Sequence, residues 1–292
     1  MGDFLQFSIT GLTIGSIYAI VALGFVTIYS VTKVINLAQG EFVMLGGMIM
    51  FSLSSSGLPY WISFIITIII VMVIGWVMEV AMIRRAKGAD AISLIILTIG
   101  AAIFIRGISS MIWGKDQVRV ASFTANEPIG IAGATITPQS IWIILIMLMV
   151  VGGLYYLIDR TIVGKAFQAC SVNPVAARLM GISPKKMASF SFTLSAGLGA
   201  LAGLAIAPIM FPAYDMGVML GVKGFSATIL GGLGSAPGAV LGGLIIGFLE
   251  SFSAGYISSG LKDAIVFTAI LAILLIRPSG ILREKNVGKG GL

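Results

Sequence analysis

Long stretches of apolar side chains, separated by short polar breaks, run along most of the chain. Residues 62–83 and 141–158 are almost free of charge and reach the ~18 residues that a helix needs to cross a bilayer. Because backbone groups in lipid must be paired within the segment, and because these runs do not alternate, they indicate helices and not a barrel. We therefore expect an all-α integral membrane protein, a polytopic helical bundle of about eight to nine hydrophobic segments, formed by residues 1–292 as one transmembrane domain. The pattern predicts spans at residues 5–31, 37–54, 60–83, 91–112, 139–159, 188–211 and 262–277.

The composition agrees with a chain that lies mostly in lipid. Of its residues, 58% are hydrophobic and only 10% are charged, whereas a soluble domain carries about 25% charged residues. The net charge of +7 does not indicate nucleic acid, because the basic residues lie in short loops between spans. The chain has no histidine and one cysteine, Cys170, so we expect no internal disulfide and no metal site.

The positions of the basic residues predict the orientation of the bundle. With the N-terminus outside, thirteen of the 18 Lys and Arg residues fall in inner loops or in the C-terminal tail, which is the side that positive residues prefer. Trp61, Trp113 and Trp142 then fall at the outer borders, where amphipathic rings prefer to lie. The sequence therefore predicts an N-out, C-in topology. The inner basic residues are Lys33, Arg84, Arg85, Lys87, Arg160, Lys165, Arg178, Lys185, Lys186, Arg277, Arg283, Lys285 and Lys289.

A glycine-rich stretch, residues 217–253, does not fit a simple span. Each half is apolar but short, with a turn expected at residues 234–238, so the stretch either crosses as two short helices or forms a broken, re-entrant pair. Irregular backbone at membrane depth is tolerated only where protein buries it or a cavity solvates it. We therefore expect Gly232, Gly234, Ser235 and Pro237 to lie inside the bundle, near a pathway. The four-residue spacing of small residues, such as Gly243 and Gly247, predicts close helix packing there, in preference to a nucleotide-binding loop.

Two segments are predicted outside the membrane. Residues 113–138 form an outer loop with short alternating runs, which indicates a hairpin. The largest inner loop, residues 160–187, predicts two short helices. Gly164 is expected to break the preceding span, Asn173 to cap the second helix with Pro174 at its first position, and Gly181 to end it.

This inner loop has the character of a docking element. One side carries small residues, and Lys165 and Arg178 lie at its edges, so the two helices suit a groove on a soluble partner. An amphipathic loop that rests on lipid headgroups is the alternative interpretation. The small residues are Ala166, Ala169, Ala176 and Ala177.

A few polar residues fall within the spans, where ionisable groups are costly and are functional candidates by default. Asn36, Gln39 and Glu41 lie at the inner start of the second span and are candidates for a gate. The structural alternative is that Asn36 caps the helix and Glu41 pairs with Lys33. Glu250 follows the glycine-rich turn and is a candidate for the translocation path, or else a buried partner for a polar group on another helix.

The other charges in the spans have structural interpretations. Glu79 is expected to pair with Arg84, one turn away, at the inner face. Arg106, two turns from Trp113, is expected to extend outward along its aliphatic stem.

The inner loop resembles the cytoplasmic coupling loop of LivH-type permeases, which are subunits of branched-chain amino acid importers of the ATP-binding-cassette class. Three further segments match the same family in the same order, at residues 15–47, 223–243 and 277–282, so the resemblance covers nearly the whole chain. In the first of these, Gln39 occupies a place where many members have His or Gln. The loop residues that carry the resemblance are Gly164, Lys165, Ala166, Gln168, Ala169, Cys170, Asn173, Ala176, Ala177, Leu179, Gly181 and Ile182.

The resemblance implies a function and a set of partners. It implies a multi-pass permease of a prokaryotic cytoplasmic membrane that works with a second related permease, two cytoplasmic ATPase subunits and an extracytoplasmic substrate-binding protein. ATP is then bound by the partners, and this chain carries no cofactor and no catalytic residue. Branched-chain amino acids are the implied solutes, with urea or short amides as the alternative.

The residues alone leave two other classes of function to weigh. The chain has no GxxxxGK[ST] element, so it does not hydrolyse ATP by that route. Glutamates within or near the spans are compatible with an ion-coupled secondary carrier, which is the main rival. An intramembrane enzyme is less favoured, because neither a Ser/His nor a Cys/His pair exists in a chain without histidine. The inner loop, with its docking character, favours the importer.

Overall fold

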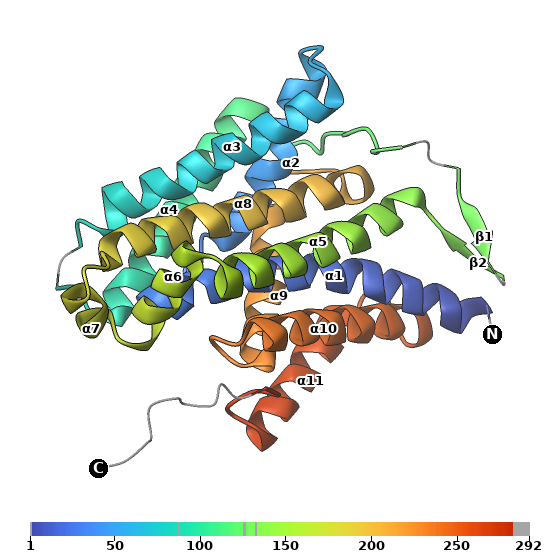
Figure 1. Cartoon of the computed structure of the whole chain (residues 1–292). Helices are drawn as coiled ribbons and strands as arrows, with labels where there is room; N and C mark the ends of the chain where they lie inside the picture. Colours follow the sequence, from blue (N-terminus) through green and yellow to red (C-terminus); the bar gives the residue numbers. More distant parts are fainter. Residues whose placement is uncertain (1, 87, 125–126, 132, 283–292) are drawn as a thin grey trace.

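The computed structural model describes residues 2–86, 88–124, 127–131 and 133–282. Within these ranges the chain is a bundle of helices with one small hairpin at its side (Figure 1). The prediction of an all-α polytopic membrane protein is confirmed. The helices are α1 (Gly2–Thr32), α2 (Gln39–Ser55), α3 (Tyr60–Met78) continued by the π-helical turn η1 (Glu79–Ile83), α4 (Ala91–Trp113), α5 (Pro138–Arg160), α6 (Ile162–Val172), α7 (Pro174–Leu179), α8 (Pro184–Met210), α9 (Met216–Gly231), α10 (Ala236–Tyr256) and α11 (Lys262–Ile276).

The predicted spans coincide with observed helices to within a few residues. In the described part of the chain, six helices are long and apolar enough to cross a membrane: α1, α3 with η1, α4, α5, α8 and α10. The shorter helices α2, α9 and α11 occupy the remaining apolar segments. The predicted hairpin in the loop before α5 is also present, as β1 (Ile129–Ile131) paired antiparallel with β2 (Ala134–Ile136).

Helix α1 forms the centre of the bundle. It is buried from Gly15 to Ile28 and contacts α5, α8, α9 and α10, whereas α4 and α5 lie at the periphery with large apolar side chains exposed. Close contact with α10 depends on glycine, because a Cβ at Gly15 would lie 2.9 Å from the Cα of Leu244, and one at Gly247 would collide with Gly15. The packing role expected for the small residues of this segment is therefore confirmed.

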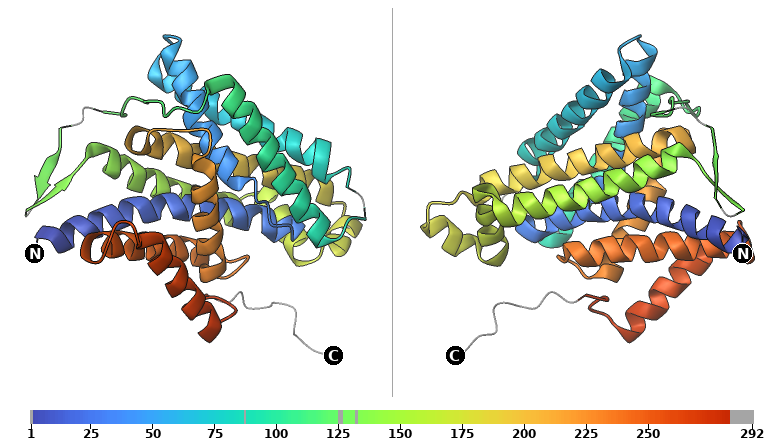
Figure 2. Two further views of the ribbon diagram at one scale, coloured as in Figure 1. Left: turned by 180° about the vertical axis from the view of Figure 1, so that it is seen from behind. Right: turned by 45° about the vertical axis from the view of Figure 1, so that its right-hand side comes forward.

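The glycine-rich stretch has an arrangement that the sequence left open. Helix α10 runs alongside α1, but α9 crosses both of them at a steep angle (Figures 1 and 2). Helix α9 passes α1 between Tyr18 and Phe25, where Thr228 Oγ1 donates to the carbonyl of Ala22. The turn between α9 and α10 spans residues 232–235 and not 234–238 as expected, because Pro237 already belongs to the first turn of α10. The stretch is thus one transverse helix followed by one longitudinal helix.

The two ends of the bundle differ in character. The N-terminus and the hairpin lie at one end, and α6 and α7 lie at the opposite end (Figure 1). Trp61 and Trp142 lie near the first end, with ring centroids 6.3 Å apart. The N-terminus and helices α6 and α7 thus lie at opposite ends of the bundle, which is compatible with the N-out, C-in topology. That topology stays a prediction. Four of the basic residues behind it, Lys87, Arg283, Lys285 and Lys289, lie outside the described residues.

Candidate functional site

The inner loop folds as two short helices, each with its own capping residue. Thr161 ends α5 and caps α6, with its side chain accepting from the backbone N–H of Gly164 at 3.0 Å. Asn173 caps α7 and accepts from the N–H groups of Val175 and Ala176, both at 3.0 Å. Pro174 takes the first helical position, and Gly181 follows α7 with φ of +80°. The predictions for Asn173, Pro174 and Gly181 are confirmed as structure.

Gly164 has a different role from the one predicted. It does not break the span, since α5 ends at Arg160 and Gly164 lies within α6. A Cβ at this position would collide with the backbone carbonyls of Leu157 and Ile158. The glycine is therefore required because the first turn of α6 packs directly against the last turn of α5.

The exposed surface of α6 and α7 is more apolar than the sequence suggested. Ala177 is buried with Cys170 and Phe167 against Val31 of α1, and Ala169 is partly buried, so these small residues face the bundle. Lys165, Arg178 and a set of large apolar side chains face outward. We call this exposed set the tip patch; it consists of Ile162, Val172, Val175, Leu179 and Met180, which are 69–90% exposed.

The candidate gate residues of the second span are buried in a polar contact between α1, α2 and α8. Gln39 lies against Gly24, its Nε2 donates to the carbonyl of Ser195 at 3.1 Å, and its Oε1 accepts from Ser195 Oγ at 2.6 Å. Ser195 Oγ also lies 2.8 Å from the carbonyl of Gly24. Asn36 does not cap the helix, which begins two residues beyond the predicted start, at Gln39; its Oδ1 accepts from the N–H of Ala38 instead.

Glu41 has a partner that the sequence did not indicate. Its Oε1 lies 2.6 Å from a guanidinium nitrogen of Arg106 on α4, so neither the expected pair with Lys33 nor the expected outward extension of Arg106 is correct. These two residues lie 65 positions apart, which local spacing does not reveal. Among the described residues, Glu41 Oε2 and Asn36 Nδ2 are buried and have no hydrogen-bond partner. The expected pair of Glu79 with Arg84 is confirmed at 2.7 Å, and Ser189 of α8 joins it.

Glu250 is the buried centre of a charge network whose outer members, Lys262 and Asp263, are partly exposed. Its Oε1 lies 2.7 Å from Lys223 Nζ and 3.0 Å from Lys262 Nζ, and its Oε2 accepts from the hydroxyl of Tyr18 at 2.6 Å. Lys223 Nζ also lies 2.7 Å from Asp263. The alternative interpretation, a buried partner for polar groups on other helices, therefore describes Glu250 well. Sequence reasoning missed Tyr18 and Asp263, for which no local pattern exists.

The candidate path residues lie at three places along α9 and not at one. Helix α9 connects the first two, because Gly217 in its first turn lies against Gly40 and Glu41, while Lys223 reaches Glu250. Gly232, Gly234, Ser235 and Pro237 lie beyond its other end, where Ser235 caps α10 by accepting from the N–H of Gly238 at 3.1 Å. Only Gly232 is buried and Pro237 is exposed, because the turn lies at the end of the helix pair, so the expectation that all four lie inside the bundle is wrong. Figure 2 (left) shows α9 running across the face of the bundle between α4 and α11.

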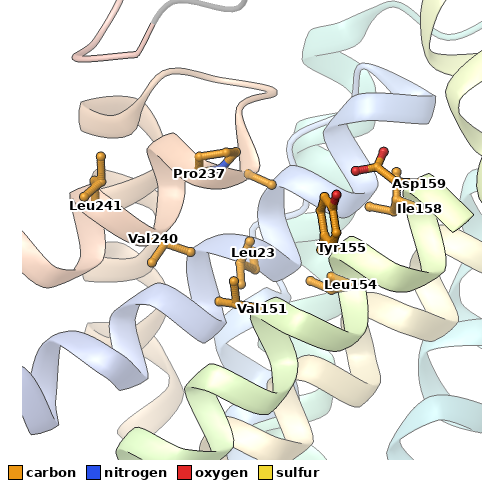
Figure 3. Close-up of a pocket in the computed structure, with 10 residues that line it drawn as sticks. Leu23, Val151, Leu154, Tyr155, Ile158, Asp159, Pro237, Val240 and Leu241 are labelled. Atoms are coloured by element: carbon orange, nitrogen blue, oxygen red, sulfur yellow. The ribbon is translucent and has the colours of Figure 1, made fainter.

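A cavity of about 590 Å³ lies on the opposite side of α1, between α5 and the start of α10 (Figure 3). Leu23, Leu154, Val151 and Val240 make its lining apolar, and Asp159 is the one carboxylate among its lining residues. A smaller cavity of about 170 Å³ extends toward α6 and includes Gly234 together with Gln168 and Ser171. In the described ranges no group of three or more His, Cys, Asp and Glu side chains is placed to hold a metal ion.

Comparison with known proteins points to one family. The model of the family described as "branched-chain amino acid transport system / permease component" matches residues 7–276. The permease LivH of the high-affinity branched-chain amino acid transport system of Escherichia coli is 32% identical, over 98% of this chain and 97% of LivH. BraD, its counterpart from Pseudomonas aeruginosa, is 31% identical over 98% of both chains. The ribose import permease RbsC of Haemophilus influenzae is 28% identical over 88% of this chain and 81% of its own length.

Proposed function

This chain belongs to the family of branched-chain amino acid transport system permease components, and from that premise we propose that it forms half of the membrane channel of an ATP-driven importer. As a member of the family it is a multi-pass transport permease. The observation that carries the proposal is the tip patch on α6 and α7, which gives the end of the bundle an exposed apolar surface on two short, capped helices.

The tip patch is suited to a protein partner. Large apolar side chains that are exposed together mark a contact surface, and Lys165 and Arg178 beside the patch supply charge at its edge. We infer that two cytoplasmic ATPase subunits act on the permease pair, and that one of them binds this patch. Because Gly164 holds α6 against the end of α5, a displacement of the patch would reach the spans directly. ATP-driven motion of the partners would then bias the bundle between two arrangements.

The pathway is proposed to follow the face formed by α4, α9 and α11. A transverse helix and partly exposed ionic groups such as Arg106 and Asp263 are poorly suited to lipid, so a second related permease is inferred to cover this face. Buried polar atoms without a partner need an explanation, and water or a passing solute would satisfy Glu41 Oε2. Glu41, Gln39 and Asn36 would then lie at a constriction, next to the start of α9.

The solute is proposed to be a branched-chain or related hydrophobic amino acid. The relatives that match 98% of this chain are named for that transport, and a relative at lower identity is named for ribose. An extracytoplasmic binding protein is proposed to provide most of the affinity.

Uptake in proteoliposomes tests this function. The permease is reconstituted with its ATPase subunits, its partner permease and the binding protein, and labelled leucine, ribose and urea are offered in turn. We expect leucine uptake that requires ATP on the side of the membrane that holds the ATPase subunits. A proton ionophore should not affect this uptake. Uptake that is abolished by the ionophore and independent of ATP would establish the ion-coupled carrier instead.

A substitution at Gly164 tests the proposed coupling route. Gly164→Val should separate α6 from α5. The number of leucine molecules transported per ATP hydrolysed should therefore fall about fivefold or more, which is the lower end of typical coupling factors. Gly153→Val is the matched control, because a Cβ at Gly153 of α5 meets no atom within 4 Å. Equal transport per ATP in the two variants would exclude this route.

A further inference from the structure

The segment that follows α11 returns to the end of the transverse helix α9. The N–H of Ile281 donates to the carbonyl of Leu230 at 2.8 Å, and the N–H of Leu282 donates to the carbonyl of Gly231 at 3.0 Å. Both carbonyls belong to the last two residues of α9. Residues 277–282, which we call the clasp, therefore cap α9 from a part of the sequence some fifty positions away.

The clasp provides hydrogen-bond donors for carbonyls at the end of α9 that would otherwise be unpaired. The last four carbonyls of any helix have no partner within the helix, and α9 ends beside the start of α10 at two residues, Leu230 and Gly231, that are both buried. An unsatisfied carbonyl on a buried residue is costly. The two N–H groups of the clasp supply donors at this point.

Two glycines allow the clasp to approach so closely. Gly232 has φ of +108° and Gly280 has φ of +77°, a region that other residues rarely adopt. A Cβ at Gly280 would lie 2.6 Å from the nitrogen of Gly232 and 2.8 Å from the carbonyl oxygen of Ile229. A Cβ at Gly232 would lie 2.5 Å from the carbonyl oxygen of Leu282. The backbones touch at both positions, so no side chain fits between them.

The same C-terminal unit holds α9 at a second place. Asp263, in the first turn of α11, lies 2.7 Å from Lys223 Nζ in the middle of α9. Helix α11 and the clasp thus contact α9 at residue 223 and again at residues 230–232. Two attachments about two turns apart fix both the position and the direction of a helix.

We propose that the clasp is a positioning element for transport: it joins α9 and α11 into one rigid unit, so that α9 keeps its place across the pathway while the bundle changes state. Gly280, Ile281 and Leu282 are positioning residues that act on solute only through α9. The functional part of this inference rests on the proposed transport function, whereas the contact itself does not.

Hydrogen exchange in the purified complex tests the contact independently of transport. The amides of Ile281 and Leu282 should exchange much more slowly than those of an unstructured chain, because both donate hydrogen bonds to carbonyls of buried residues of α9. In Gly280→Ala the peptide that contains them should lose this protection, together with the peptide at the end of α9. Unprotected amides in the wild-type complex would overturn the clasp, whatever the protein transports.

Transport per ATP tests the positioning role. Gly280→Ala should lower leucine moved per ATP by about fivefold or more, while complex yield and ATPase rate stay near those of the wild type. Gly260→Ala is the matched control, since its Cβ would meet only Ser258 Oγ, at 3.8 Å. Unchanged transport per ATP in Gly280→Ala would overturn the role. A loss of yield, ATPase and transport in equal proportion would also overturn it, because the clasp would then serve folding alone.

Discussion

At the scale of single residues, a costly feature of this bundle is the buried carboxylate of Glu250. Burying a charge is unfavourable unless partners replace its hydration. The ammonium groups of Lys223 and Lys262 both lie beside one carboxylate oxygen of Glu250, and the Tyr18 hydroxyl donates to the other oxygen. Asp263 balances the second positive charge through Lys223. The network is thus neutral, and each member depends on the others.

Removing the Tyr18 hydroxyl is the smallest change that tests this network. Tyr18→Phe deletes one hydrogen bond to a buried charge, which should destabilise the protein by about 1.5–3 kcal/mol. The thermal midpoint of the detergent-solubilised complex should therefore fall by several degrees. Tyr256→Phe provides the control, because Tyr256 is exposed and its ring contacts with Phe7 and Phe252 survive the change. Identical midpoints for the two variants would show that the hydroxyl does not support Glu250.

Cys170 gives a second prediction at this scale. Its thiol is buried against Val31 and Phe167, and burial raises the pKa of the thiol. Since the thiolate is the reactive form, we expect maleimide to modify the folded protein slowly at pH 7 and quickly after unfolding. Reaction of the folded protein at the rate of free cysteine would show that α6 does not stay packed on α1.

Which of these pairs the sequence reveals depends on separation along the chain. Glu79 and Arg84 lie only five positions apart, so a local pair could be predicted, and the π-helical turn Glu79–Ile83 carries the chain from one to the other. Glu41 with Arg106 and Tyr18 with Glu250 join different helices, 65 and 232 positions apart. Such pairs follow from how the helices pack, and hydrophobic periodicity carries no information about that.

At the scale of elements, the caps were predictable and the direction of α9 was not. Asn173, Pro174 and Gly181 have local preferences that act within one turn, so the sequence located α7 correctly. The direction of α9 is determined by distant contacts: Gly40 at its start, Lys223 with Asp263 at its middle and the clasp at its end. The two alternatives for the glycine-rich stretch therefore stayed open until the structure resolved them.

The cap of α7 provides a test at this scale. Asn173→Ala removes both hydrogen bonds to the first turn of α7 and should cost about 1 kcal/mol. For a helix of six residues this loss is large, so we expect α7 to fray and transport per ATP to fall. Asn173→Ser should restore the coupling, because serine is a comparable cap. The thermal midpoint of the spans should stay unchanged in both variants; a loss that serine does not repair would show that the asparagine acts other than as a cap.

At the scale of the whole molecule, the proposed function depends on the side of the membrane that α6 and α7 face. The bundle places them at the end opposite the N-terminus, and the basic residues predict that this end faces the cytosol.

Single cysteines in a Cys170→Ser background test the prediction with a membrane-impermeant maleimide. Lys115→Cys, in the exposed loop after α4, should react in intact cells, whereas Val175→Cys, in the tip patch, should react only after the membrane is opened. In opened membranes, added ATPase subunits should slow the labelling of Val175→Cys and leave that of Lys115→Cys unchanged, since only the tip patch is expected to be covered. The reverse labelling pattern in intact cells would place α6 and α7 outside, where no ATP-driven partner can reach them, and the importer mechanism would fail with it.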